Sequence, residues 1–135
     1  MGIRVWVDNW QMQCCGEPFG IGAEVSWTLV DADKEWLADV LGGEAAATVD
    51  AAEEHHGGTR EGTSATAATV TGISAVHCRF APLPGKPAHT RYPVPDSGTL
   101  TALTSADGWT SDRDELQFVG YLVELATRGV DTVGR

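Results

Sequence analysis

Positive charge is scarce in this sequence, and the scarcity excludes a large class of partners. Lysine and arginine together number 9 among 135 residues, against 19 acidic residues, and the formal net charge is −10. Nucleic acids and anionic membranes are bound chiefly through lysine and arginine. The nearest thing to a basic cluster, "GKPAHTR" at residues 85–91, is thin. We therefore expect neither nucleic acid nor membrane as a partner.

Long hydrophobic runs are also lacking. No stretch approaches the roughly 20 apolar residues that span a bilayer, and the opening "MGIRVWVDNW" has no charged n-region followed by an apolar h-region, as a secretory signal would. The three cysteines are odd in number, which favours reduced thiols over a disulfide framework. These features predict a soluble, acidic, cytoplasmic protein.

The common catalytic signatures are missing. The sequence contains no G-x-x-x-x-G-K-[ST], no G-x-G-x-x-G after a strand, no H-E-x-x-H and no G-x-S-x-G. No pair among the 19 acids is singled out by its spacing as a general acid and base. The sequence leans against an enzyme without deciding the matter.

What is present predicts a mixed α+β domain. Alternating apolar residues predict strands, and the period changes after Asp33, which can cap a helix. That helix has Trp36, Leu37 and Val40 on one face and a glycine stop at Gly42 or Gly43. The predicted strands cover residues 3–8, 23–30, 64–80, 98–106 and 116–126, with Gly72 as a bulge or bend. We predict a small, strongly bent antiparallel sheet or β-barrel, in the style of SH3 and OB domains.

The remaining segments are predicted as connections within one domain, residues 1–127. Residues 44–63 begin with an Ala-rich stretch that could extend as a second helix to His56, so they are predicted as a helical or loop insertion. Five prolines make residues 81–95 an extended loop without ladder hydrogen bonds of its own. Residues 107–115 form an acidic loop, and residues 128–135 are predicted to be a loose C-terminal tail.

The cysteines leave several interpretations open. Four candidate ligands, Cys14, Cys15, His77 and Cys78, come as two adjacent pairs, whereas zinc knuckles use pairs spaced by two to four residues. On a strand, His77 and Cys78 point to opposite faces. A zinc site, a redox device and a cysteine nucleophile remain alternatives. The preferred interpretation is small, buried, apolar side chains, with no cofactor.

The tryptophans suggest binding. Trp27 and Trp36 follow the core periodicity of their elements, whereas Trp6 lies opposite Ile3, Val5 and Val7 and is either covered or offered to a partner. Turns surround the other aromatic residues, and such surfaces bind peptides or flat ligands. We predict a non-enzymatic domain that binds a protein or small ligand, with a homodimer as one compatible assembly. The predicted ligand-binding residues are Trp10, Gln11, Gln13, Phe19, Tyr92 and Trp109.

The segment "WQMQCCGEPFGIGAEVSWTL" resembles an uncharacterised family of small actinobacterial proteins. Members carry a short strand, then W-Q-M-Q-C-C-G-x-P-F, then a G-x-x-V-x-W strand. The family is a domain of unknown function, so the resemblance implies no activity, substrate or catalytic residue. It does imply that the turn from Trp10 to Phe19 is a family hallmark, either for its shape or for a site centred on it.

Overall fold

The computed structural model describes residues 2–14, 16–54, 65–82, 84–85, 87 and 89–127. Its first strand, β1 (Gly2–Asp8), is the strand that the alternating sequence predicts. The predicted turn from Trp10 to Phe19 is wrong in its first part, because α1 (Asn9–Cys14) follows β1 at once, whereas Gly16–Pro18 has no regular structure. This short helix is held by tertiary contacts: it buries Gln11 and Met12, and the Asn9 amide donates to the Phe118 carbonyl oxygen at 3.1 Å.

The predicted strand over 23–30 is interrupted at Thr28, and its two halves pair with different partners. The short strand β2 (Phe19–Gly20) precedes β3 (Glu24–Trp27), which pairs with β6 (Thr66–Cys78). After Thr28, β4 (Leu29–Val30) pairs instead with β5 (Ala51–Glu53). One continuous stretch of chain therefore carries both ends of the sheet.

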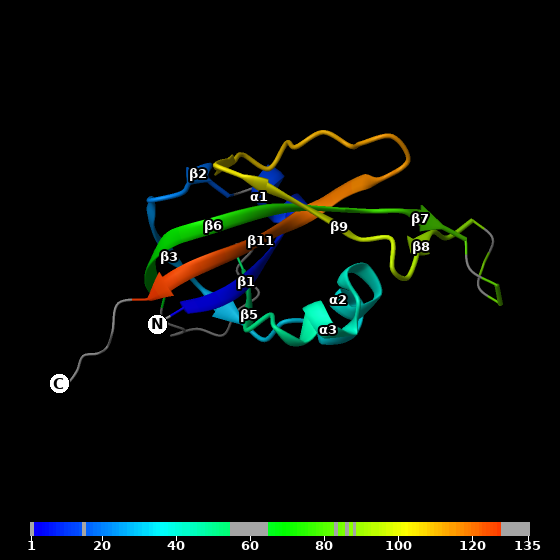
Figure 1. Cartoon of the computed structure of the whole chain (residues 1–135), viewed down its shortest axis with the longest axis horizontal. Coiled ribbons are helices and arrows are strands. Elements are labelled where there is room, and N and C mark those ends of the chain that lie inside the picture. Colours follow the sequence, from blue (N-terminus) through cyan, green and yellow to red (C-terminus); the bar gives the residue numbers. More distant parts are fainter. Residues whose placement is uncertain are drawn as a thin grey trace.

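That interruption brings the sheet close to a closed barrel, as predicted. The strand order is β3-β6-β11-β1-β5-β4, with β11 spanning Gln117–Thr127 and β9 (Thr99–Leu103) also paired with β6. Because β3 runs into β4, the first and last strands of this order are consecutive in the chain (Figure 1). Pairing is antiparallel except between β1 and β5, which run parallel. The fold is thus a mixed α+β structure with a barrel-like sheet.

The helices follow the prediction in one case and depart from it in the other. Helix α2 (Lys34–Leu41) has Asp33 as its N-cap, whose carboxylate accepts from the Trp36 N–H at 3.1 Å, and it ends at Gly42. Helix α3 (Gly43–Ala47) ends nine residues before the predicted limit at His56, because Ala51–Glu53 form β5 rather than helix. Pairing with β1 overrides the helix propensity of the alanines. Residues 55–63 of the predicted insertion, the first residue of the predicted strand over 64–80, and the predicted tail at 128–135 lie outside the described residues.

In the second half, the long strands are correctly predicted and their details differ. Next to Gly72, the register of β6 against β11 shifts by one residue, which confirms the predicted bulge. The predicted strand over 98–106 divides into β9 and β10 (Ser105–Ala106), and β10 pairs with β2. The Pro-rich segment does have ladder pairing at its ends, contrary to prediction, because β7 (Phe80–Ala81) pairs with β8 (Tyr92–Pro93).

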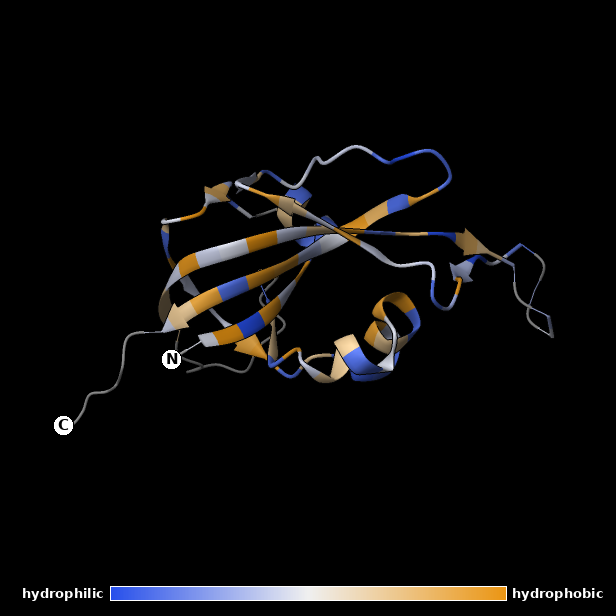
Figure 2. Ribbon diagram, viewed as in Figure 1, coloured by the Kyte–Doolittle hydropathy of each residue, from blue (hydrophilic) through white to orange (hydrophobic). Residues whose placement is uncertain are grey.

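Alternation along the strands separates two hydrophobic clusters. Val5 and Val7 of β1 point into the barrel, where the cluster includes Phe19, Trp27 and Tyr121. Trp6, between them, points outward to a second cluster beneath α2 and α3. Figure 2 shows the corresponding alternation of hydrophobic and hydrophilic residues along β1, β6 and β11. The helices therefore cover one outer face of the barrel, and the space beside them contains the site described next.

Candidate functional site

A pocket of about 240 Å³ lies where α2 packs against the outer face of the barrel. It receives residues from the end of β1, the start of α1, the β4–α2 connection, α2 and the end of β5. We call it the acidic pocket. Its lining residues are Trp6, Asp8, Gln11, Val30, Asp31, Asp33, Trp36, Leu37, Ala52, Glu53 and Glu54.

Two indole rings wall this pocket. Trp6 is 3% exposed and Trp36 is half-buried, and their ring centroids lie 5.6 Å apart with the planes inclined at 60°. The two rings are therefore in tilted contact rather than in a parallel stack. The Trp6 Nε1–H donates to the Asp8 Oδ1 atom at 2.7 Å, which fixes the carboxylate beside the ring.

Acids dominate the polar lining. Asp8, Asp31, Asp33, Glu53 and Glu54 contribute five carboxyl groups, and none of the described residues that line the pocket is lysine, arginine or histidine. Glu53 is only 2% exposed, although it is charged at neutral pH in water. This acidic lining favours a positively charged occupant.

The electrostatics of Asp8 reflect that cost. Burial raises the pKa of the Asp8 carboxyl above its ordinary value of 3.8 and outweighs the hydrogen bonds from Trp6 and Gln11, which lower it. The nearby Glu54 carboxylate adds to the rise in pKa. A cation entering the pocket would offset both the desolvation and the repulsion.

Gln11 connects the pocket to the segment that the sequence singled out. Its side chain is 3% exposed, and the Nε2–H group donates to the Glu53 carbonyl oxygen at 3.3 Å and to the Glu54 Oε1 atom at 3.4 Å. This predicted ligand-binding residue thus faces the acidic pocket. It joins α1 to the end of β5, two segments that are 42 residues apart in the chain.

Three other predicted residues lie on a different surface. Trp10 is 48% exposed on α1, and Trp109 is 66% exposed in the loop before β11. Gln13, one helical turn after Trp10, donates from Nε2 to the Gly108 carbonyl oxygen at 2.8 Å. The structure therefore joins α1 to the loop that carries Trp109.

The structure does not bring the last two predicted residues to either place. Phe19 is 7% exposed and packs edge-on against Trp27, with ring centroids 5.1 Å apart, so it belongs to the barrel interior. Tyr92 is on β8, in the hairpin that Figure 1 shows well apart from α1.

The candidate metal ligands are distributed over different environments. Cys14 is exposed at the end of α1, whereas Cys78 is fully buried in the cluster beneath the helices. The neighbouring His77 ring instead packs against Phe118 of the barrel interior, with centroids 5.8 Å apart. Within the described part of the chain, no three histidine, cysteine or acidic residues form a group that could hold a metal ion. Cys15 lies outside that part, so the predicted set of four is not tested.

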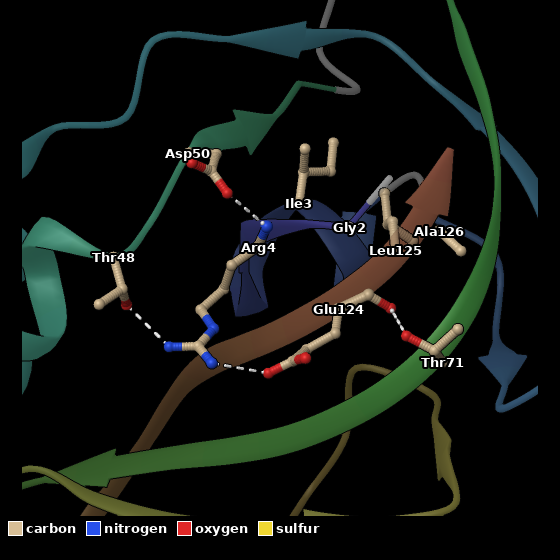
Figure 3. Close-up of a pocket in the computed structure, with 9 residues that line it drawn as sticks. All are labelled: Gly2, Ile3, Arg4, Thr48, Asp50, Thr71, Glu124, Leu125 and Ala126. Atoms are coloured by element: carbon tan, nitrogen blue, oxygen red, sulfur yellow. Dashed lines mark hydrogen bonds and ion pairs between the residues drawn. The ribbon is translucent and has the colours of Figure 1, made fainter. Parts of the chain in front are cut away.

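A second pocket, of about 380 Å³, is a weaker candidate for a ligand site (Figure 3). It contains Arg4, whose guanidinium donates to the Glu124 carboxylate and to the Thr48 hydroxyl oxygen, both at 2.8 Å. The Arg4 backbone N–H donates to Asp50 at 2.8 Å. Glu124 neutralises the Arg4 cation and Asp50 accepts from the Arg4 backbone N–H, so the charged side chains of this pocket already have partners within the protein.

A family model matches residues 1–127, and its description is a family of unknown function (DUF6578). The chain belongs to the DUF6578 family. Comparison of this DUF6578 chain with curated proteins and with solved structures finds no match. No helix among the described residues has the length and apolar character needed to cross a membrane.

Sequence reasoning missed most of the acidic pocket. It placed Trp6 and Asp8 on one face of β1, which was a usable signal, but it assigned Trp36 to the core and Glu53 to a helix. Glu53 reaches the pocket only because β5 pairs with β1 and β4. Nothing in the spacing of these residues along the DUF6578 sequence indicates that pairing.

Proposed function

We propose that this DUF6578 domain is a binding module that takes a small organic cation, such as a primary amine, a guanidinium or a quaternary ammonium compound, into the acidic pocket. The observation that carries the proposal is the lining: among the described residues, five carboxyl side chains and two tryptophans, with no basic residue, surround one hollow of about 240 Å³. The size suits a small molecule, since drug-sized ligands occupy pockets of roughly 300–1,000 Å³.

The two tryptophans support an organic rather than an inorganic ion. A cation within about 6 Å of an indole centroid is attracted by the ring, and the attraction grows when the site is desolvated. Trp36 is half-buried and lines the pocket, and Trp6 packs against it, so both rings lie beside a cation bound there. The carboxyl groups are spread around the walls and would surround a ligand whose charge is carried on a hydrocarbon body.

Gln11 and Asp8 define the polar end of the proposed site. The Asp8 carboxylate is oriented by the Trp6 indole N–H, and Gln11 is oriented by Glu53 and Glu54. These groups are fixed before a ligand arrives, so little side-chain entropy is lost when it binds. Pairing of an ammonium or guanidinium group with these acids would be a charge-assisted hydrogen bond.

The test compares cations with neutral molecules of the same shape. Choline is titrated against 3,3-dimethylbutan-1-ol, and butylamine against butan-1-ol, by calorimetry at low ionic strength and pH 7.5. We expect at least one cation to bind, and its neutral counterpart to bind at least about tenfold more weakly, because only the cation gains the Coulomb and cation–π terms. Equal binding of both members of each pair, or no binding of any cation, would refute the proposal.

Matched variants locate the binding. Glu54→Gln removes one pocket charge, and we expect it to weaken cation binding several-fold, whereas Glu44→Gln removes an exposed charge on α3 and should leave binding unchanged. Trp36→Phe keeps an aromatic face and should retain part of the affinity that Trp36→Ala loses. Equal loss in the Glu54 and Glu44 variants would mean that net charge, rather than the pocket, attracts the ligand.

A further inference from the structure

The second surface, made of Trp10, Gln13 and the loop 107–115, is separate from the acidic pocket and uses different side chains. Among the described residues, Trp109 is the most exposed large hydrophobic side chain at 66%, and Trp10 is 48% exposed. Single exposed hydrophobic residues are ordinary. These two differ from that ordinary case, because hydrogen bonding between α1 and the loop fixes their positions relative to each other. We call this surface the tryptophan surface.

The frame begins with the contact between α1 and the loop. The Gln13 Nε2–H group donates to the Gly108 carbonyl oxygen at 2.8 Å. Gly108 has a φ of +87°, and a Cβ at this position would lie 2.7 Å from the Met12 Cβ atom, so only glycine allows this approach. Trp10 lies one turn before Gln13 on the same side of α1.

Two buried side chains hold the loop from below. The hydroxyl oxygen of Tyr121, which is fully buried, accepts from the Gly108 N–H at 3.0 Å and lies 2.8 Å from the Thr110 Oγ1 atom. The Nε2 atom of His77, also fully buried, lies 2.8 Å from the Ser111 carbonyl oxygen. A carbonyl oxygen can only accept, so this bond requires the proton on Nε2. Hydrogen bonds to two buried side chains therefore hold the loop in place from inside the barrel.

Two carboxylates complete the frame. The Asp107 Oδ1 atom accepts from the Trp109 N–H at 2.8 Å, and the Asp112 Oδ1 atom accepts from the Phe118 N–H at 2.8 Å. The loop is thus ordered on both sides of an indole that contacts solvent over most of its surface. Order in the free state lowers the entropy lost when a partner binds, and rigid exposed tryptophans are frequent hot spots of interfaces.

The charge around Trp109 indicates the chemistry of the partner. Asp107, Asp112, Asp114 and Glu115 are all exposed in the same loop, where Arg113 is the single basic residue. A second copy of this chain, whose net charge is −10, would bring like charges together. A basic partner would instead pair with the carboxylates and place arginine side chains over the indole rings.

We infer that the tryptophan surface is a docking site for a basic linear segment of another protein, in which arginine alternates with apolar residues. The aromatic rings supply the contact area and the acids supply attraction and orientation. This inference does not rest on cation binding in the acidic pocket. The two sites share no lining residue, although both include residues of α1.

The test uses a defined probe, a fluorescein-labelled peptide of five Arg-Leu repeats, and a control peptide in which glutamate replaces arginine. Binding is measured by fluorescence anisotropy at low salt. We expect the basic peptide to bind, Trp109→Ala to weaken its binding at least about tenfold, and Asp114→Asn with Glu115→Gln to weaken it most at low salt, where the lost attraction is least screened. Leu100→Ala, at a side chain that is 53% exposed elsewhere, is the matched control and should bind like wild type.

Each other outcome overturns the inference. Equal binding by wild type and Trp109→Ala would show that the peptide follows net charge alone. Equal binding of the acidic peptide would show that charge plays no part. Self-association that Trp109→Ala abolishes, measured by sedimentation velocity, would make a second copy the occupant. Glu54→Gln should leave peptide binding intact, so failure of this inference is distinguishable from failure of the proposed cation site.

Discussion

Trp6 and Trp10 are four residues apart in the chain and have opposite environments. Trp6, on β1, is 3% exposed and walls an acidic pocket that is large enough for a small molecule only. Trp10, on α1, is 48% exposed and belongs to a surface that is open to a macromolecule. The strand-to-helix change between Asp8 and Asn9 sends these two indoles in different directions. The same residue type therefore lies in two different environments, which we propose serve two kinds of recognition.

Replacing the two tryptophans separately should give the largest difference. We expect Trp6→Ala to lower the free energy of unfolding by about 3–5 kcal/mol, because it leaves a cavity beneath α2. Trp10→Ala should change it by less than about 1 kcal/mol, because its ring is half in solvent. Urea unfolding followed by circular dichroism measures both. Equal destabilisation by the two substitutions would contradict the assignment of Trp10 to a surface.

The two described cysteines extend the contrast between interior and surface. Burial raises the pKa of the Cys78 thiol to about 11, whereas Cys14 is exposed. We expect iodoacetamide at pH 7.5 to modify Cys14 at least about a hundredfold faster than Cys78, because only the thiolate reacts. Peptide mapping by mass spectrometry measures both rates. Slow modification of both thiols together with bound zinc would favour the metal-site alternative instead.

Tyr121→Phe tests whether the tryptophan surface depends on its buried support. The substitution leaves the buried Gly108 N–H without its acceptor, and we expect a loss of about 1–3 kcal/mol in the free energy of unfolding. Hydrogen exchange should increase in the loop 107–112, and peptide binding should weaken. Cation binding in the acidic pocket should stay the same. Weaker cation binding with unchanged peptide binding would contradict the proposed independence of the two sites.

Asp8→Asn should have the smallest effect, and one that depends on pH. In the folded protein the Asp8 pKa is raised above 3.8, so the stability that this group contributes is fully present below pH 3.8 and is lost as pH rises through the raised pKa. Asparagine does not titrate, and its oxygen can still accept from the Trp6 indole N–H. The stability of Asp8→Asn relative to wild type should therefore increase with pH across that window.

The measurement is urea unfolding at intervals from pH 3 to pH 7, with Asp39→Asn as a control for the loss of one negative charge. A stability difference that stays constant or decreases as pH rises would contradict the burial of Asp8. Cation binding should weaken at low pH in wild type, where Asp8 is protonated, and depend less on pH in Asp8→Asn.

Local sequence determined much of the secondary structure. Alternation of apolar residues identifies β1, β6 and β11, and the Asp33 cap with the Gly42 stop identifies α2. Prediction from local sequence failed where pairing or packing with a distant segment overrides a local preference. The alanines after α3 form β5 because β1 and β4 offer backbone partners, and α1 forms because its buried side has a place beneath the loop.

The sequence by itself determined the residues available to the two sites: abundant acids, few bases and five tryptophans, of which all but Trp27 belong to one site or the other. Only the tertiary structure decided which of these residues meet. Trp6, Trp36 and Glu53 come together because the parallel pairing of β5 with β1 places its end beneath α2, and Trp109 joins Trp10 because Gly108 permits close contact with α1. Such meetings depend on contacts between residues 40 to 100 positions apart, which a local pattern does not record.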